Sequence, residues 1–187
     1  MAATSTGETW QQTVEPAGRN MMAPTSTSSM HGVNAGEEAD YLTYMVAHHM
    51  EEAAAAKQLQ RSSRAQMRTL GASIVTRQSA EIAMMNKWLA TWYRGHSPTT
   101  GYRPMMRDLS KMSGDALDET FLRDMIPHHM MAVIMSQQLL KHGGVRHQPV
   151  AAFAARVREA EHAEMFRLQR YLADWFGGDG VLCPIGN

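Results

Sequence analysis

The sequence predicts an all-α fold, a four-helix bundle built from two repeated helical hairpins, and three observations point to it. Apolar residues recur at alternating steps of three and four along four long stretches, which is the spacing of helices that pack in a bundle. No stretch of useful length alternates apolar and polar residues as a half-buried strand would. The four stretches also divide into two halves that resemble each other, which indicates two copies of one helical unit.

The helices are expected in one domain, residues 37–178, because chains of 187 residues usually form a single domain. Residues 1–36 are rich in Ser, Thr, Ala, Gly and Pro and lack hydrophobic periodicity, which predicts a disordered tail that also contains methionine. Residues 179–187 are expected to form a short C-terminal tail. The predicted helices cover about 37–61, 64–94, 118–141 and 149–176, so that the first repeat is about 38–95 and the second about 118–178.

Each helix is predicted from its own apolar stripe, and local signals mark the ends of the last two. Asp115 and Asp118 are residues of the type that caps a helix start, and they introduce the third stretch. Glycine pairs at 143–144 and 177–178 follow the third and fourth stretches, where glycine commonly ends a helix. In chain order the expected core stripes are Leu42, Met45, His49, Ala53, Ala56 and Leu59; Val75, Ile82, Met85, Leu89 and Trp92; Leu122, Met125, His129, Ala132 and Leu139; and Val157, Met165, Leu168, Leu172 and Trp175.

Composition excludes several classes of function. Lys plus Arg and Asp plus Glu both number 18, and a chain with no net charge is a poor partner for nucleic acid or an anionic membrane surface. No apolar run approaches the roughly 20 residues that span a bilayer, so we expect a soluble chain. The lone Cys183 excludes an internal disulfide framework and a cysteine-based zinc site. Methionine, by contrast, occurs 17 times, as core filler or as soft metal ligand.

The two halves repeat a histidine-containing segment. Residues 42–50 match residues 122–130 at five positions, which pair Leu42, Met45, His48, His49 and Met50 with Leu122, Met125, His128, His129 and Met130. Partner stretches match as well, with Glu81 corresponding to Glu164. A duplicated hairpin predicts a pseudo-two-fold axis, across which the two His-His segments would face each other.

These repeated segments are the predicted metal site. Residues at i, i+3 and i+4 share one face of a helix, so each segment offers one thioether and two imidazoles toward one point. Burying two His-His pairs without a ligand would require partners for several polar nitrogens in the core. The alternative is a set of hydrogen-bonded core histidines. The predicted ligands are Met45, His48, His49, Met125, His128 and His129.

The donor types favour copper. Di-iron four-helix proteins take a Glu-x-x-His pair from each of two helices, and methionine occupies the corresponding glutamate position here. Replacing a hard oxygen by a soft sulfur favours Cu(I), with silver as a surrogate, while the imidazoles also suit Cu(II).

Weaker candidates surround this set. Glu81 and Glu164 are either groups that orient an imidazole or parts of solvated helix faces. Met85 is more typical of a core residue than of a ligand, and Glu159 with His162 is more typical of a surface pair. The weaker metal or orienting candidates are Met50, Glu81, Met85, Met130 and Glu164, and the methionines and His31 of the tail form either a metal-capturing arm or a plain linker.

The run from Met112-Ser113-Gly114 through Phe121-Leu122-Arg123-Asp124-Met125-Ile126-Pro127-His128-His129 resembles the signature of the DUF305 family over about residues 38–177. The resemblance implies a ferritin-like helical bundle and an exported, periplasmic or secreted copper-binding protein of metal homeostasis or resistance. Residues 2–36 show neither a basic start nor an apolar stretch of a signal peptide, so this localisation comes from the resemblance alone.

Three functions compete at this point. The first is a copper-binding protein that sequesters the metal or transfers it to or from a partner protein, without turnover. The second is a metal-dependent redox enzyme of ferritin-like type, and the third is a metal-free bundle that binds a partner. The sequence contains no phosphate loop, no His-Glu-x-x-His and no Gly-x-Ser-x-Gly motif, so catalysis is not the favoured interpretation. The oligomeric state stays open.

Overall fold

The computed structural model of the chain describes residues 37–96 and 102–177, and this part is helical. It contains α1 (Glu38–Gln58), α2 (Ala65–Trp92), α3 (Gly114–Lys141) and α4 (Gln148–Phe176), and a 3-10 turn, η1 (Leu59–Arg61), continues α1. No strand occurs among the described residues, which confirms the predicted all-α, four-helix fold. None of these helices combines the length and apolar character that crossing a bilayer requires. The two predicted tails lie outside the described residues.

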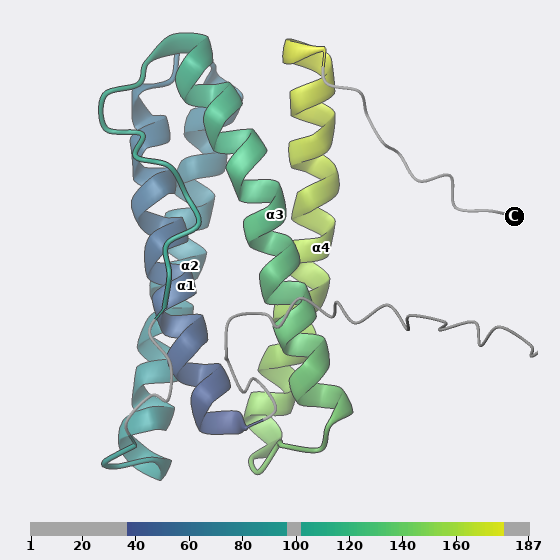
Figure 1. Cartoon of the computed structure of the whole chain (residues 1–187). Helices are drawn as coiled ribbons and strands as arrows, with labels where there is room; N and C mark the ends of the chain where they lie inside the picture. Colours follow the sequence, from purple (N-terminus) through teal and green to yellow (C-terminus); the bar gives the residue numbers. More distant parts are fainter. Residues whose placement is uncertain (1–36, 97–101, 178–187) are drawn as a thin grey trace, which may run out of the picture. The chain divides into compact units, whose positions relative to one another are not determined.

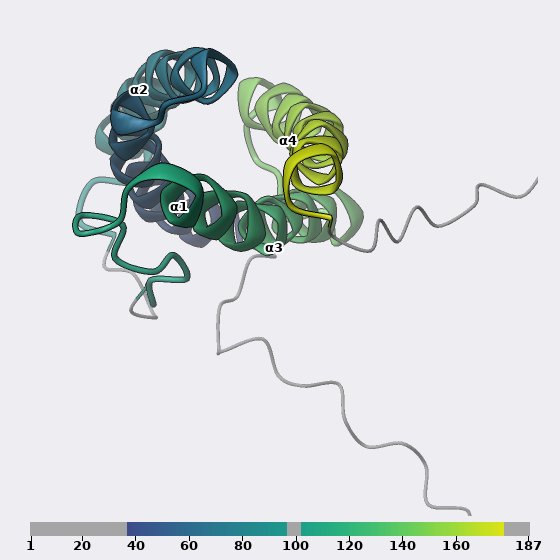
Figure 2. The ribbon, with the colours of Figure 1, turned by 90° about the horizontal axis from the view of Figure 1, so that it is seen from above.

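The helices pair in chain order. The most extensive packing joins α1 with α2 and α3 with α4, and α1 also contacts α3. Figure 1 shows α1 and α3 running in opposite directions, with the connection between α2 and α3 returning along the bundle. Seen from above, α2 and α4 lie along one side and α1 and α3 along the other (Figure 2). Within the contact between α1 and α3, the segments that contain the two His-His pairs lie next to each other, because the ring centroids of His48 and His128 are 3.7 Å apart.

The third helix begins earlier than the sequence indicated. It starts at Gly114 after an extended Ser113, four residues before the predicted start, and neither Asp115 nor Asp118 caps it. Asp118 is instead buried and accepts hydrogen bonds from Ser62 Oγ at 2.8 Å and Arg64 Nη1 at 2.9 Å. The carboxylate of Asp118 therefore binds the segment between α1 and α2 and does not cap its own helix. The end of α4 at Gly177, whose φ is 61°, is as predicted.

Close approach of α1 and α2 depends on a helical glycine. A Cβ atom at Gly71 would lie 2.5 Å from the carbonyl oxygen of Ala56 and 2.9 Å from Leu59 Cβ. Glycine in the middle of a helix costs about 1 kcal/mol relative to alanine. The contact with α1 explains why no larger residue occupies the position.

Glu38 ties the start of α1 to the turn between α3 and α4. Its carboxylate is buried and accepts the backbone N–H groups of Arg146 at 2.6 Å and His147 at 2.9 Å. His147 Nδ1 donates to it at 2.6 Å, and Tyr93 OH donates at 2.8 Å. Burial by itself raises the pKa of Glu38, but these hydrogen bonds outweigh it and hold the pKa below the ordinary 4.5.

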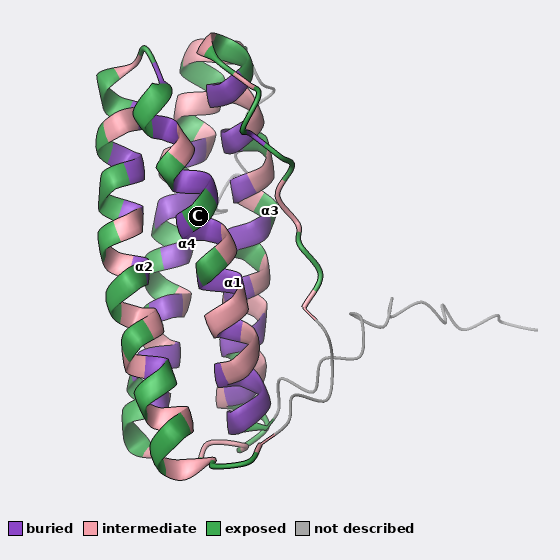
Figure 3. Cartoon of the chain, turned by 90° about the vertical axis from the view of Figure 1, so that its left-hand side faces the viewer, coloured by how far each residue is buried: buried purple, intermediate pink, exposed green. Residues whose placement is uncertain are grey.

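The core of the bundle consists of two apolar clusters with a polar layer between them. Buried faces of all four helices turn inward (Figure 3). One cluster contains Tyr41, Leu42, Met45, Met85, Met135, Leu139 and Phe153, and the other contains Leu59, Met67, Leu70, Ile74, Phe121, Met125 and Leu168. The polar layer consists of His48, His49 and Glu52 from α1; Arg77, Gln78 and Glu81 from α2; His128 and His129 from α3; and Glu161 and Glu164 from α4.

Candidate metal centre

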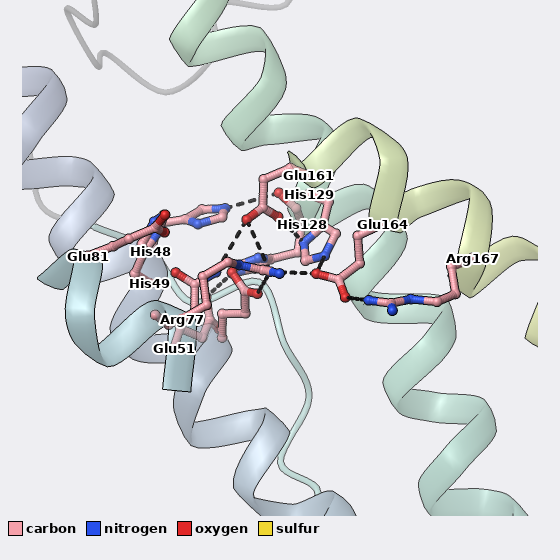
Figure 4. A network of polar contacts seen from close by, with 12 residues as sticks. His48, His49, Glu51, Arg77, Glu81, His128, His129, Glu161, Glu164 and Arg167 are labelled. Atoms are coloured by element: carbon pink, nitrogen blue, oxygen red, sulfur yellow. Dashed lines mark hydrogen bonds and ion pairs between the residues drawn. The ribbon is translucent and has the colours of Figure 1, made fainter. Parts of the chain in front are cut away.

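The side chains of the polar layer converge from all four helices (Figure 4). All four of its histidines are 0% exposed, which is rare for so many polar groups unless each has a partner. The rings of His48 and His128, which occupy equivalent positions in the two repeats, lie against each other with their centroids 3.7 Å apart and their planes tilted by 32°. The structure therefore brings together the four predicted imidazole ligands.

Three of these imidazoles are oriented by hydrogen bonds from Nε2. His48 Nε2 donates to the backbone carbonyl oxygen of His128 at 3.0 Å, and His49 Nε2 donates to Glu81 Oε2 at 3.0 Å. His128 Nε2 donates to Glu51 Oε2 at 3.2 Å. Because carbonyl and carboxylate oxygens accept these bonds, Nε2 carries the proton and Nδ1 carries the lone pair.

The three Nδ1 atoms have no hydrogen-bond partner among the described residues. Burial lowers the pKa of His48 well below the ordinary 6.5, and the neighbouring His128 lowers it further. Burial also lowers the pKa of His128, so both rings are neutral at pH 7. A buried lone pair without a donor is costly, and a metal ion is one group that would satisfy it.

His129 differs because both of its ring nitrogens face carboxylates. Nδ1 lies 2.6 Å from Glu161 Oε2 and Nε2 lies 3.4 Å from Glu164 Oε2, although neither contact has the direction of a good hydrogen bond. Burial lowers the pKa of His129, but the charges of Glu161 and Glu52 outweigh it and raise the pKa to about 10. His129 therefore holds a proton at neutral pH, which a bound metal ion would replace.

Glu52 is the carboxylate between the two His-His pairs. It is 0% exposed, and neither of its oxygens has a hydrogen-bond partner among the described residues. Arg77 Nη2 lies 3.6 Å from Oε1, which is an ion-pair distance but not a hydrogen bond. Burial, and then the charge of Glu161, raise the pKa of Glu52 to about 8.

Donor atoms of the layer fall into two groups of three that both include Glu52. One atom each of His48, His49 and Glu52 lies within 4.8 Å of the other two. The same holds for one atom each of Glu52, His128 and His129. Small adjustments of three donors at this spacing would place a metal ion about 2 Å from each of them. This is the distance at which imidazole and carboxylate ligands hold copper or zinc.

An outer set of ion pairs surrounds the histidines. Arg77 Nη2 lies 2.5 Å from Glu164 Oε2 and 3.8 Å from Glu161 Oε1, and Arg167 also bonds Glu164. Burial alone would raise the pKa of Glu164, but His129 and Arg77 lower it to about 2. Gln78 Nε2 donates to Glu161 Oε1 at 3.3 Å.

Glu51 connects the polar layer to the loop before α3. It accepts the backbone N–H groups of Met105 at 2.7 Å and Met106 at 2.8 Å, together with the hydroxyl of Tyr102 and Nε2 of His128. Burial raises the pKa of Glu51, yet these donors lower it to about 2. Through Glu51 the loop holds the ring of His128.

The methionines lie differently from the imidazoles. Met45 and Met125 are fully buried, but each packs in a different apolar cluster, one on either side of the polar layer. Met85 packs in the same cluster as Met45. Met50 is 58% exposed and Met130 is 40% exposed, so both lie on the surface. Coordination by any of these sulfurs stays a prediction.

The sequence allowed two interpretations of Glu81 and Glu164, as groups that orient an imidazole or as parts of solvated helix faces. In the structure each of the two carboxylates contacts an imidazole.

The sequence analysis missed Glu52 and Glu161. Glu52 follows the two histidines of α1 by three and four positions, so it shares their helix face. Glu161 precedes Glu164 by three positions and shares its face in the same way. Both could have been found by extending the helix-face argument one turn. Glu51, Arg77 and Gln78 were also missed.

Comparison with known proteins agrees with this fold. The profile of a family described as "Domain of unknown function (DUF305)" matches residues 38–172, which confirms the resemblance. No curated protein matches the sequence. The structure is similar to CopM in a silver-bound form (23% identity, 75% of this chain and 98% of that chain, TM-score 0.65). CopM in its Cu(II)-bound form gives the same identity and coverage with a TM-score of 0.64. A DUF305 protein of Streptomyces coelicolor, described as presumed to be secreted, is 19% identical over 75% of this chain and 94% of its own, with a TM-score of 0.64.

Proposed function

Because the chain belongs to the DUF305 family, we propose that it is a copper-binding protein whose polar layer holds the metal between the two His-His pairs. The observation that carries this proposal is the set of buried Nδ1 lone pairs on His48, His49 and His128, none of which meets a hydrogen-bond donor among the described residues. Their Nε2 atoms already donate to fixed oxygens, which is the arrangement of metal-ligating histidines in general.

The charge of the layer supports a cation. Three buried carboxylates, those of Glu52, Glu161 and Glu164, meet the guanidinium groups of Arg77 and Arg167. The carboxylates thus exceed the fixed positive charges by one, and the two protons on Glu52 and His129 more than offset that charge when no metal is bound. A copper ion would replace these protons and satisfy the free nitrogens at the same time.

Imidazole and carboxylate donors suit Cu(II), and thioethers suit Cu(I). Met45 and Met125 precede the histidine pairs by one helical turn, in α1 and α3 respectively. We propose these two sulfurs as further ligands when the bound ion is Cu(I) or silver. The solved forms of CopM that contain silver, Cu(I) and Cu(II) support a fold that accommodates both oxidation states.

We further propose that the protein acts outside the cytoplasm, in the periplasm or after secretion, and serves copper homeostasis or resistance. The description of the Streptomyces coelicolor relative supports this localisation. Sequestration, or exchange with a copper donor or acceptor protein, requires binding without turnover. We also propose that this four-helix bundle belongs to the ferritin-like class of helical bundles.

Competition titration tests the proposal. The full-length chain and a variant with His48, His49, His128 and His129 replaced by alanine would be titrated anaerobically with Cu(I), and in air with Cu(II), against a chromogenic chelator. The variant should bind at least about 100-fold more weakly, which corresponds to ~2.7 kcal/mol. Equal affinity and equal copper content in the two proteins would contradict the site. Oxygen consumption with Cu(I) would separate a binding protein from a redox enzyme.

A further inference from the structure

We propose that the polar layer holds two copper ions, one between His48 and His49 and the other between His128 and His129, with the carboxylate of Glu52 bridging them. This inference rests on the proposed copper-binding function and adds to it the number of ions and the residue that joins them.

The grouping of the donors carries the inference. Among the described residues, the buried ligand atoms gather as two triads that share Glu52, and not as one set of five. Each triad contains two imidazoles and one carboxylate, a donor set that by itself holds a divalent transition metal. A single ion in the first triad would leave the Nδ1 lone pair of His128 buried without a partner among the described residues, and a single ion in the second would leave those of His48 and His49.

Glu52 is suited to bridge because neither of its oxygens is held by a hydrogen bond from the described residues. Arg77 Nη2 lies 3.6 Å from Oε1 as an ion-pair partner only, so one oxygen is available to each triad. Only the first of the two repeats supplies such a carboxylate, so a single glutamate would have to serve both pairs of histidines. The position equivalent to Glu52 in the second repeat is Ala132, which packs as a small core residue and supplies no ligand.

Each triad also has its own outer carboxylates. Glu81 accepts from Nε2 of His49 in the first triad, and Glu51 accepts from Nε2 of His128 in the second. Outer carboxylates of this kind fix the tautomer of a metal-binding imidazole and increase its basicity. Both triads therefore have the two shells of a metal site, and one hydrogen bond, from His48 Nε2 to the carbonyl of His128, joins them directly.

Copper counting on half-site variants tests the inference. Full-length wild type, a His48→Ala/His49→Ala variant, a His128→Ala/His129→Ala variant and the fourfold variant would be loaded with Cu(II), passed through a desalting column and analysed for metal and protein. All four proteins contain the same N-terminal tail, so the fourfold variant provides the baseline for any copper bound outside the polar layer. Above that baseline, wild type should hold two ions and each half-site variant one.

Electron paramagnetic resonance provides a second readout that depends on Glu52. Two Cu(II) ions in a shared site lie about 4 Å apart, close enough to couple magnetically. The wild-type spectrum should show a half-field transition and fewer spins than copper atoms. Glu52→Gln, which keeps the size of the side chain, should lose the coupled signal, whereas Glu159→Gln, at an exposed position of α4, should keep it. Far-ultraviolet circular dichroism would verify that the variants are folded.

The outcomes separate the two proposals. Wild type with one ion above the baseline, lost in both half-site variants, would overturn the two-ion site and leave copper binding intact. Wild type with no more copper than the fourfold variant would overturn the proposed function as well. A coupled signal that persists in Glu52→Gln would exclude Glu52 as the bridge.

Discussion

Replacing Glu81 with alanine should weaken copper binding about tenfold without unfolding the bundle. Glu81 Oε2 accepts a hydrogen bond from His49 Nε2–H at 3.0 Å, and this bond leaves Nδ1 of the same ring free to bind a metal. Without the acceptor, the ring of His49 is free to rotate and to place its proton on Nδ1. The ligand would then have to be reoriented and deprotonated whenever copper binds.

The magnitude follows from the geometry of the bond. A hydrogen bond to a charged group contributes about 1.5–3 kcal/mol when it is buried. His49 is fully buried, but the side chain of Glu81 is 18% exposed, so water replaces part of the lost interaction. The lower end, about 1.5 kcal/mol, corresponds to a change in affinity of roughly tenfold. Tenfold is also the lower end of the range for loss of an outer-shell partner of a metal-ligating histidine.

The assay is a chelator competition with Cu(II) at fixed pH on wild type, Glu81→Ala and Glu81→Gln. Glutamine keeps an oxygen that accepts the bond from His49, so its affinity should fall less than about threefold. Glu159→Ala is the matched control for loss of one helix carboxylate, because Glu159 is exposed and contacts only Arg158 among the ion pairs of the described residues. An unchanged affinity in Glu81→Ala would refute the claim that this carboxylate positions a copper ligand.

Three further predictions concern the fold that positions the site. Gly71→Ala should lower the free energy of unfolding by about 2 kcal/mol in urea titration, because the new Cβ would meet the carbonyl oxygen of Ala56 at 2.5 Å. Asp118→Asn should cost about 2 kcal/mol by the same assay, since a buried bond to Arg64 loses its charge. The difference in unfolding free energy between wild type and Glu38→Gln should be constant above the ordinary pKa of 4.5 and shrink as the pH falls through the lowered folded-state pKa. No change in stability for Gly71→Ala or Asp118→Asn, or a pH-independent difference for Glu38→Gln, would contradict these expectations.

The fold was predictable because helix periodicity is a local property of the chain. Four apolar stripes and two glycine stops located α1, α2 and α4 to within a few residues. The predicted start of α3 was wrong because Asp118 is a residue type that commonly caps helices. In the structure its carboxylate instead accepts hydrogen bonds from Ser62 and Arg64, in the segment between α1 and α2. Only the packed structure brings these partners together.

The candidate site was predictable to the extent that it is repeated. The duplicated His-His pairs stood out in the sequence, and the structure brings all four rings into one layer. Glu52 was not found because a glutamate on a helix ordinarily lies on a solvated face. Met45 and Met125 share helix faces with their histidines, yet α1 and α3 run in opposite directions, which places the two sulfurs on opposite sides of the layer. The direction in which two helices cross is a tertiary property that spacing in the sequence does not specify.

Anomalous scattering at the copper absorption edge, measured on crystals of the copper-loaded full-length chain, tests the central claim most directly. The account predicts peaks inside the bundle, within bonding distance of Nδ1 of His48, His49 and His128 and of the carboxylate of Glu52. Peaks confined to surface residues such as Met50 and Met130, with the polar layer unchanged, would contradict it.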